Sequence, residues 1–423
     1  MVTPQIGDIV EVETKQGTEL GKLLESYEPG LILLKLNSGY NIGLKKEDVK
    51  DIRIIEKAKQ IEEKKIEVDN KGKQVVDIIM AGGTIASKLD PSTGGVRDLG
   101  NSEELFKTYP EIFLTSAPNI VKLAAKATEN MDSSDWYKIA RAVVKSLKGS
   151  CTGIVVMIGT DFLHYFSAYL ALGLGKINKP VVITYSQRSS DRGSSDARLN
   201  LECATKVALS DMAGVYVVGH ASENDDFCYV LPATKCRKMH TSRRDTFKAI
   251  NSSPIAKVWP DKIEVLRAYD KRGKEKVKEN FDFETKIALI KFYPGQNPDL
   301  LEWYEKQGYR GLVIEASGLG HVIAEGGKSW LPALRKLIGR GIIICAAPQT
   351  IYGRLDHLVY SPGRLLKKTG VIFLEDMLPE TAFVKLGLVL GRLGKNVKKE
   401  EAERLMLENW VGEFNDRLEE GFI

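Results

Sequence analysis

Three short stretches carry hydroxyl, lysine and carboxylate side chains close to apolar runs. Gly82-Gly83-Thr84 follows the run "VVDIIM", and Gly159-Thr160-Asp161 follows "GIVVMI". The third stretch, "ATKCRKMHTSRRDTF", contains Lys235 and Lys238. A threonine hydroxyl is a weak nucleophile at neutral pH, but a lysine whose pKa is lowered by burial can act as its base, and an aspartate can orient that lysine. The residue types therefore indicate nucleophilic chemistry at threonine, with a turn or N-cap role as the alternative interpretation of each threonine.

Motifs for other chemistries are incomplete. A P-loop requires G-x-x-x-x-G-K-[ST], but "VIAEGGKS" has Val322 at the first glycine position, and Ser87 replaces the glycine before Lys88. The segment Gly318–Gly320 has Ile323 where a dinucleotide fingerprint needs glycine or alanine. The five histidines lack metal-ligand spacing, and no G-x-S-x-G elbow is present. The sequence thus predicts no nucleotide, metal or serine-hydrolase site, which leaves threonine.

Composition describes a globular protein of two or three domains. The chain has 423 residues, of which 43% are hydrophobic and 28% are charged. A net charge of +5 is small for this length and does not argue for an RNA partner. Five scattered cysteines without a CxxC pair favour a reducing cytoplasm. We expect no signal peptide and no membrane-spanning segment, because no run of 18 apolar residues occurs.

The elements that must position these residues fall into two kinds. Residues 5–55 contain about five short strand-like runs separated by Gly, Asn and Pro turns, which predicts a small closed β-barrel of SH3 or Sm type. Such barrels often contact RNA or protein, and a plain structural cap is the alternative. The charged stretch Glu56–Gln74 is expected to be a solvated linker.

From Val75 onward, strand-like and helix-like patterns alternate, which predicts doubly wound parallel sheets with sites at the carboxyl ends of strands. Ser134–Leu147 has an apolar face typical of a helix, and the polar tail from Lys398 also indicates a helix. We predict a β-barrel domain over 1–55, a linker over 56–74, a larger α/β domain over 75–282, a smaller one over 283–397 and a tail over 398–423. The candidate strands are Val75–Met80, Ile120–Ala124, Gly153–Ile158, Pro180–Tyr185, Val215–Val218, Lys286–Phe292, Gly311–Glu315 and Ile342–Ala346.

The threonine motifs resemble those of the two-domain L-asparaginases that use a threonine nucleophile. The family's T-G-G-T-I is similar to "AGGTI", with Ala81 for the first threonine and Thr84 at the catalytic position. Its G-T-D motif is present as Gly159-Thr160-Asp161. Its lysine stands in a K-x-x-T-x-x-x-x-x-F context, which matches Lys238 and sets Lys235 aside. Three motifs in order, over Val75 to Gly394, make this resemblance specific.

The resemblance implies a role for each matched residue. Thr84 would attack a side-chain amide carbon and form an acyl-enzyme, while Thr160, Asp161 and Lys238 would move protons and position water. Backbone N–H groups of the two threonine loops would stabilise the oxyanion. Asp161 would also hold the substrate's ammonium group. The residues expected to contact substrate are Gly83, Thr128, Glu129 and Gly159, where Thr128-Glu129 corresponds to the family's Ser-Gln pair.

The loop after Thr84 departs from the family pattern. Many relatives have a tyrosine there, but "IASKLDPSTGGVRDLG" has none. Asp90 or Thr93 could take its place, or Thr84 is activated in another way. The division of labour between Thr84 and Thr160 therefore stays open at the level of sequence.

The N-terminal strands and the linker are additions that an asparaginase does not need. Together with "QRSSDRGSSDARLNL" and "RKMHTSRRDTFKAIN", they resemble the family of archaeal glutamyl-tRNA(Gln) amidotransferase D subunits. That resemblance implies hydrolysis of glutamine or asparagine and supply of ammonia to the amidotransferase E subunit, which would convert Glu-tRNA(Gln) to Gln-tRNA(Gln). It implies no cofactor in this chain, ATP and Mg in the partner subunit, and a homodimer within a cytoplasmic heterotetramer.

Two other functions remain as alternatives. The first is a free-standing cytoplasmic L-asparaginase whose barrel is incidental. The second is an RNA- or protein-binding module on an inactive hydrolase scaffold, which the complete set of Thr84, Thr160, Asp161 and Lys238 disfavours. The basic cluster around Lys238, with Arg237, Arg243 and Arg244, is interpreted as bracing the site rather than contacting RNA.

Overall fold

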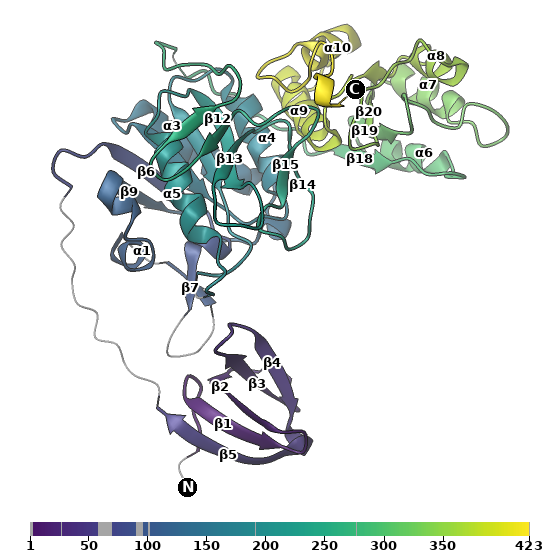
Figure 1. The fold of residues 1–423 in the computed structure, drawn as a ribbon. Coiled ribbons are helices and arrows are strands. Elements are labelled where there is room, and N and C mark those ends of the chain that lie inside the picture. The colour runs from purple at the N-terminus through teal and green to yellow at the C-terminus, as the bar shows by residue number, and fades with distance from the viewer. Residues whose placement is uncertain are drawn as a thin grey trace.

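The computed structural model describes residues 3–26, 28–57, 70–89, 96–99, 102–190, 192–275 and 277–422. Figure 1 shows three parts that follow one another along the chain: a small β-domain, a larger α/β domain and a smaller α/β domain that ends near the C-terminus. The middle of the predicted linker, residues 58–69, lies outside the described residues, as do Asp90 and Thr93.

The β-domain is one antiparallel sheet in the order β4-β3-β2-β1-β5. Along β1 every second residue is buried, as expected for a sheet with one face on a core. Val10, Val12 and Leu34 form that small core. The prediction of about five short strands is confirmed. Their bounds are Ile9–Thr14 for β1, Thr18–Leu24 for β2, Leu31–Leu36 for β3, Asn41–Lys45 for β4 and Val49–Glu56 for β5.

The larger domain is built on an eight-stranded sheet in the order β17-β16-β13-β12-β11-β10-β6-β9. The five predicted strands are parallel: β6 (Val75–Met80), β9 (Ala117–Lys122), β10 (Gly153–Met157), β11 (Pro180–Thr184) and β12 (Gly214–His220). Three unpredicted strands extend the sheet in antiparallel fashion: β13 (Cys228–Pro232), β16 (Ala256–Val258) and β17 (Ile263–Val265). The sheet is therefore mixed, with a parallel half that carries the threonine motifs.

Helices cover both faces of this sheet, as the doubly wound prediction requires. One face is covered by α3 (Ser133–Lys148) and α4 (Leu163–Leu174), and the other by α5 (Ala197–Ala208) with the short α1 (Ser102–Thr108) and α2 (Ile112–Thr115). Helix α3 begins with a capping box, since the Asp132 side chain accepts from the backbone N–H groups of Ser134 and Asp135.

The smaller domain has a parallel sheet in the order β18-β19-β20-β21, with helices on both faces. Its strands are Ile287–Lys291, Gly311–Ala316, Ile343–Pro348 and Ile372–Phe373. One face carries α6 (Asp299–Lys306), α7 (Leu331–Gly339) and α8 (Ser361–Lys367), and the other carries α9 (Pro379–Leu393) and α10 (Lys399–Leu407). Helix α9 also packs on α4 of the larger domain, so it joins the two cores.

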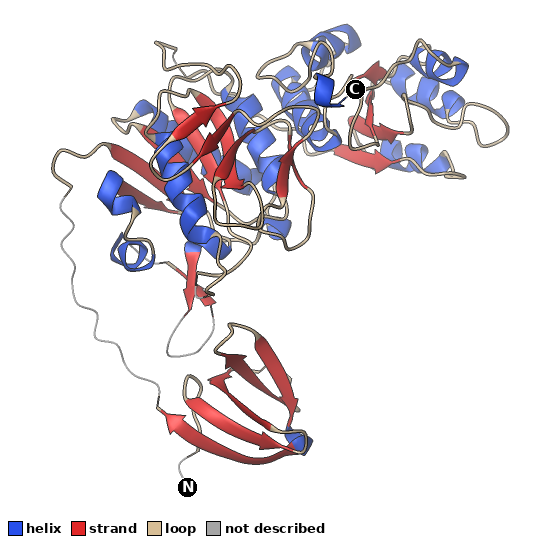
Figure 2. Cartoon of the chain, viewed as in Figure 1, coloured by secondary structure: helices blue, strands red, loops and turns tan. Residues whose placement is uncertain are grey.

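Two short antiparallel hairpins of the larger domain are separate from its main sheet (Figure 2). One pairs β7 (Ser87–Leu89) with β8 (Val96–Asp98), and the other pairs β14 (Cys236–Lys238) with β15 (Phe247–Ala249). The first follows directly on Thr84, and the second carries Lys238. In the described segments, no helix is long and apolar enough to cross a membrane.

Candidate active site

The two threonine motifs begin at neighbouring strand ends. Strands β6 and β10 are parallel partners, and their last residues, Met80 and Met157, lie opposite each other. The pairing continues one residue further, because the Ala81 N–H donates to the Met157 carbonyl at 2.9 Å. The loops that carry Thr84 and Thr160 therefore leave the same edge of the sheet side by side.

Glycine allows these two loops to touch. Gly83 has φ = 82°, and a Cβ added there would lie 2.5 Å from the Cα of Gly159. Gly159 in turn lies against Thr128, since a Cβ at Gly159 would be 3.3 Å from the Thr128 Cγ2. A side chain at Gly83 would force the loops apart, so this position needs glycine for both its backbone angle and its space.

Backbone contacts hold the turn that carries Thr84. Thr84 begins a 3₁₀ turn, Thr84–Ala86, and is half-buried. The Ser87 hydroxyl donates to the Gly83 carbonyl at 3.0 Å, and the Tyr109 hydroxyl donates to the Ile85 carbonyl at 3.0 Å. Among the described residues, no side chain hydrogen-bonds the Thr84 hydroxyl. The turn is thus fixed through neutral contacts to its main chain.

Charged contacts surround Thr160. The Lys238 Nζ donates to the Thr160 Oγ1 at 2.9 Å and to the Asp161 Oδ1 at 2.6 Å. The Lys238 side chain is 12% exposed and that of Asp161 is 58% exposed. Lys238 lies opposite Phe247 in the β14–β15 hairpin, so the lysine-to-phenylalanine spacing in the sequence is the span of that hairpin. The structure thus brings Thr160, Asp161 and Lys238 together beside the Thr84 turn.

The Thr128-Glu129 pair lies on the 3₁₀ turn Thr128–Asn130. Thr128 is 6% exposed, and its Oγ1 accepts from the N–H of Phe162 at 3.3 Å, so it braces the loop that carries Thr160. Glu129 is exposed. The two residues therefore differ: the buried Thr128 hydroxyl holds the loop that carries Thr160, whereas the Glu129 side chain faces solvent.

Lys235 has a different environment from Lys238. Its side chain is 1% exposed, and its Nζ donates to the Asp376 Oδ2 at 2.7 Å across the junction of the two α/β domains. Burial lowers the pKa of Lys235, although the Asp376 carboxylate opposes that shift. Lys235 is therefore held in a buried ion pair away from Thr160, where Lys238 makes its contacts.

His164, one of the five histidines without metal-ligand spacing in the sequence, is a neighbour of the site. It lies on α4, four residues after Thr160, and burial, together with the charges of Arg237 and Lys238, lowers its pKa to about 3. Its Nε2 is 3.9 Å from the Glu380 Oε1, and burial raises the pKa of Glu380. His164 is therefore uncharged at neutral pH and lies between the site and the smaller domain.

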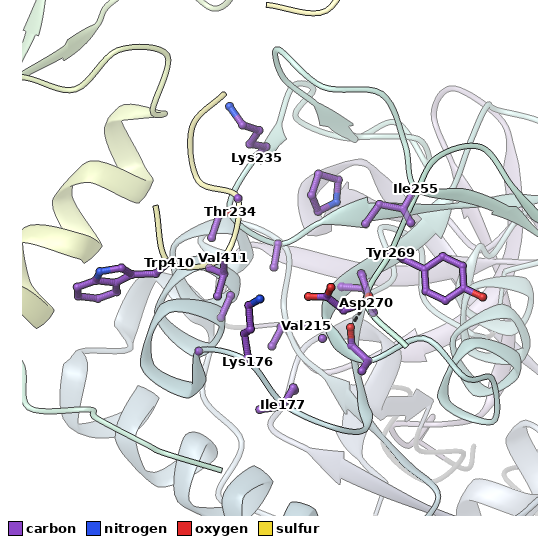
Figure 3. Close-up of a pocket in the computed structure, with 18 of the residues that line it drawn as sticks. Lys176, Ile177, Val215, Thr234, Lys235, Ile255, Tyr269, Asp270, Trp410 and Val411 are labelled. Carbon is purple, nitrogen blue, oxygen red and sulfur yellow. Dashed lines mark hydrogen bonds between the residues drawn. The ribbon is translucent and has the colours of Figure 1, made fainter. Parts of the chain in front are cut away.

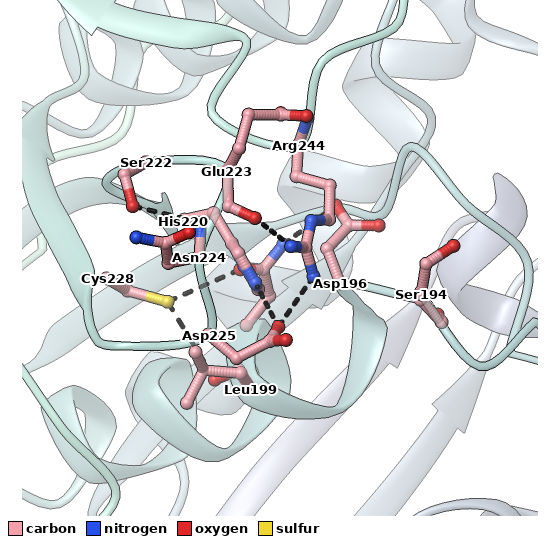
Figure 4. A network of polar contacts seen from close by, with 12 residues as sticks. Ser194, Asp196, Leu199, His220, Ser222, Glu223, Asn224, Asp225, Cys228 and Arg244 are labelled. Atoms are coloured by element: carbon pink, nitrogen blue, oxygen red, sulfur yellow. Dashed lines mark hydrogen bonds and ion pairs between the residues drawn. The ribbon is translucent and has the colours of Figure 1, made fainter.

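The arginines of the basic cluster are all paired with acidic side chains. Arg237 contacts Glu380 at 3.0 Å, and Arg243 contacts Asp245 at 2.8 Å. Arg244 contacts Asp225 at 2.6 Å within the polar network of Figure 4. These contacts favour the bracing interpretation of the cluster over RNA binding.

A cavity of about 570 Å³ lies elsewhere, between the larger domain and the segment that follows α10 (Figure 3). None of Thr84, Thr160, Asp161 and Lys238 lines it; its polar lining includes Lys176, Arg267, Tyr269, Asp270, Trp410 and Asn415. Within the described ranges, no three histidine, cysteine, aspartate or glutamate side chains gather as metal ligands do.

Three family descriptions match the chain in sequence order. "GatD N-terminal domain" matches residues 5–55, "Asparaginase, N-terminal" matches 75–271, and "Glutaminase/Asparaginase C-terminal domain" matches 286–406. The thermostable L-asparaginase from Thermococcus kodakarensis superposes with a TM-score of 0.72 at 26% identity, covering 81% of this chain and 100% of its own. The chain therefore has the two-domain asparaginase fold with an added N-terminal β-domain.

Relatives of similar length narrow the class further. The D subunit of the glutamyl-tRNA(Gln) amidotransferase from Thermococcus kodakarensis is 45% identical over 425 residues, covering 96% of this chain and 94% of its own. The corresponding D subunit from Pyrococcus horikoshii is 44% identical over 420 residues, with the same coverage. The chain belongs to the family of glutamyl-tRNA(Gln) amidotransferase D subunits.

Proposed function

We propose that this chain is the amidase component of a tRNA-dependent amidotransferase. It hydrolyses the side-chain amide of glutamine or asparagine and supplies ammonia for the conversion of Glu-tRNA(Gln) to Gln-tRNA(Gln). The observation that carries the proposal is the contact of Lys238 with both Thr160 and Asp161, next to the Thr84 turn. Membership of the D-subunit family supports the link to tRNA.

The proposed reaction gives each of these side chains a step. The Thr84 hydroxyl attacks the amide carbon and passes its proton to a base. The base then gives this proton to the leaving nitrogen, so that collapse of the intermediate breaks the C–N bond, releases ammonia and leaves an acyl-enzyme. N–H groups of the Gly83 and Thr160 loops face the developing oxyanion, and each such donor is typically worth about 3 kcal/mol. Water, positioned by Thr160 and Lys238, then cleaves the ester and restores Thr84.

Substrate recognition is assigned to the same edge of the sheet. The half-exposed Asp161 carboxylate is available to bind the substrate's α-ammonium group. Gly83 and Gly159 offer backbone groups where the two loops meet, and Glu129 stands exposed beside them. Thr128 holds the Thr160 loop, since its hydroxyl oxygen accepts from the Phe162 N–H, which leaves its hydroxyl proton available for the substrate contact expected from the family.

The partner proposed for this chain is the amidotransferase E subunit, which would bind ATP and Mg and receive the ammonia. We infer a homodimer within a heterotetramer, located in the cytoplasm. The cytoplasmic location is supported by five free, buried cysteines, the usual state of thiols in a reducing compartment. The similarity of this chain to a solved L-asparaginase structure supports its proposed role as the amidase of the assembly.

The test is transfer of labelled nitrogen. The purified chain is mixed with the E subunit, ATP, Mg, Glu-tRNA(Gln) and glutamine labelled with ¹⁵N in its amide, and Gln-tRNA(Gln) is analysed by mass spectrometry. We expect the label in the tRNA-bound glutamine, none with Thr84→Ala, and recovery with Thr84→Ser. Release of free ammonia is measured with and without the partner and charged tRNA.

The outcomes separate the alternatives. Fast hydrolysis of free asparagine by the chain alone, unaltered by the partner and tRNA, would favour a free-standing asparaginase. No hydrolysis in any mixture would favour a binding module. Label transfer that survives Thr84→Ala would overturn the assignment of the nucleophile.

A further inference from the structure

The segment Ser186–Ser195, here called the bridging loop, connects β11 to the start of α5; residue 191 lies outside its described part. The loop is anchored at its base by Asp196, which is fully buried. The Asp196 carboxylate accepts from the backbone N–H groups of Gln187 and Arg188 and from the hydroxyl of Ser186 at 2.9 to 3.1 Å. Several charge-assisted hydrogen bonds to one buried group make a firm base.

The bridging loop contacts the turn that carries Thr84. The Ser190 hydroxyl donates to the Ser87 carbonyl at 3.2 Å, and the Ser87 hydroxyl donates to the Gly83 carbonyl at 3.0 Å. Two consecutive hydrogen bonds thus lead from the loop to the residue before Thr84. The turn itself is short, and 3₁₀ turns hold their geometry weakly, so contacts from outside contribute much of its order.

The same loop contacts the β-domain. The Arg192 guanidinium lies 5.1 Å from the centre of the Tyr40 ring, a cation–π distance. Gly39 is next to it: a Cβ there would be 3.0 Å from the Arg192 Cγ. Tyr40 and Gly39 belong to the turn between β3 and β4, so the tip of one β-domain hairpin rests on the loop.

The loop is also linked to the hairpin that carries Lys238, through the network in Figure 4. From Asp196 the chain of contacts runs to Asn200 at 3.3 Å, then to His220 at 2.6 Å and to Asp225 at 3.0 Å. Asp225 accepts from Arg244, which lies between β14 and β15. The bridging loop therefore connects the β-domain with both the Thr84 turn and the β14–β15 hairpin that carries Lys238.

We propose that the bridging loop positions the Thr84 turn and that Ser190 is the residue through which it does so. We further propose that the β-domain acts on the site through Arg192. This inference rests on the proposed amide hydrolysis and adds how the site is controlled. When Tyr40 seats against Arg192, the loop keeps Ser190 against Ser87 and holds Thr84 ready for attack. A partner or tRNA that moves the β-domain would change the rate without touching the substrate.

The test compares four single variants of the full chain and one double variant. Ser190→Ala removes the hydroxyl, Ser190→Thr keeps one, and Arg192→Met and Tyr40→Leu remove the two sides of the cation–π contact. We expect Ser190→Ala to lower kcat for glutamine hydrolysis roughly 2- to 10-fold, as for one lost hydrogen bond, with KM unchanged. Ser190→Thr should restore kcat. Tyr40→Leu and Arg192→Met should each lower kcat, and the double variant should be no worse than either one alone.

Hydrogen exchange provides a readout that does not depend on activity. Amides in residues 83–89 should exchange faster in Ser190→Ala and in Arg192→Met than in the wild type. The matched control is Ser189→Ala, because the neighbouring Ser189 side chain makes no hydrogen bond among the described residues; it should change neither kcat nor exchange. Unchanged exchange and kcat in Ser190→Ala, or additive effects of the Tyr40 and Arg192 variants, would overturn the inference. A wild type without amidase activity even in the presence of the E subunit and charged tRNA would contradict the proposed function, and exchange alone would then decide this inference.

Discussion

Lysine–carboxylate pairs occur both at the junction of the two α/β domains and at the strand-end site, but they differ in burial. At the junction, Lys235 pairs with Asp376 and Lys385 pairs with Glu413, and all four side chains are at most 1% exposed. At the site, the Asp161 partner of Lys238 is 58% exposed. A buried pair resists disruption, because loss of either partner leaves the other charge buried and unpaired. A half-exposed pair can exchange protons with solvent or substrate.

The comparison explains how two lysines three residues apart serve different purposes. Lys235 precedes β14 and points into the junction, whereas Lys238 ends β14 and reaches Thr160. Residue type is the same in both places. What differs is the partner and its exposure, which suit Lys235 to stabilising the fold and Lys238 to the role proposed for it at the Thr160 hydroxyl.

The largest effect is expected from Lys238→Met. Loss of a group that transfers protons typically costs about 10²- to 10⁴-fold in rate, so kcat for glutamine hydrolysis should fall by that factor. The melting temperature should hardly change, because an ion pair with an exposed partner is worth at most about 1 kcal/mol. The control is Lys248→Met, which removes a 2.6 Å ion pair to Asp245 in the same hairpin. Equal rates in the two variants would show that Lys238 has no special role at the site beyond that of an ordinary ion pair in this hairpin.

The second prediction concerns the junction. Lys235→Met leaves the Asp376 carboxylate buried without its partner, which should lower the free energy of unfolding by about 3–5 kcal/mol in urea titrations. The double variant Lys235→Met, Asp376→Leu removes both charges and should recover most of that loss. The folded fraction of each variant should keep its kcat. A large fall in kcat of fully folded Lys235→Met would place this lysine in the chemistry instead.

The sequence predicted the parallel strands well for a physical reason. Strands buried on both faces read as continuous apolar runs, so "VVDIIM" and "GIVVM" were placed within a residue of β6 and β10. The hairpins β7–β8 and β14–β15 were missed, because strands of three residues are too short to show alternation. Lys238 nevertheless stands on one of these missed hairpins, so its assignment depended on a family motif and not on periodicity.

The supports of the candidate site were harder to predict than the two threonines proposed to react. Thr84 and Thr160 follow buried strands directly, so the sequence shows where they lie. Tyr109 and Ser190 each support the Thr84 turn through one hydrogen bond to a carbonyl oxygen. In the sequence, Tyr109 is 24 residues from its partner Ile85, and Ser190 is 103 residues from its partner Ser87. Any residue offers a carbonyl oxygen, so no sequence pattern marks these contacts.

The third prediction uses His164, which borders both regions. Its pKa is about 3 in the folded chain and about 6.5 when unfolded. Between these values the unfolded chain binds the proton and the folded chain does not. The stability due to neutral His164 is therefore complete above pH 6.5 and is lost as pH falls toward 3. From pH 7 to pH 5 the loss should be about 2 kcal/mol in urea titrations.

The matched variant for this measurement is His164→Phe, which cannot titrate and should lose less stability over the same pH range. The groups that face His164 are Glu380 on α9 and the cations Arg237 and Lys238 on β14. Glu380, whose pKa is raised, contributes with the opposite sign, but it is present in both proteins, so their difference isolates the histidine. Identical pH slopes would show that the pKa of His164 is the same in the folded and the unfolded chain.

The smallest effect should come from Thr128→Val, which has nearly the same shape but cannot accept the Phe162 N–H at 3.3 Å. The cost of one such hydrogen bond is about 1 kcal/mol, so kcat should fall about 5-fold as the Thr160 loop loosens, and Thr128→Ser should recover it. The exposed neighbour provides the control, since Glu129→Gln should leave stability unchanged. If Thr128→Val instead raised KM without altering kcat, the Thr128 hydroxyl would be contacting substrate. The position of the Thr160 loop would then depend on the charged contacts of the site alone. A fall in kcat at constant KM would mean that a neutral hydrogen bond to a buried threonine is needed to keep Thr160 within reach of Lys238.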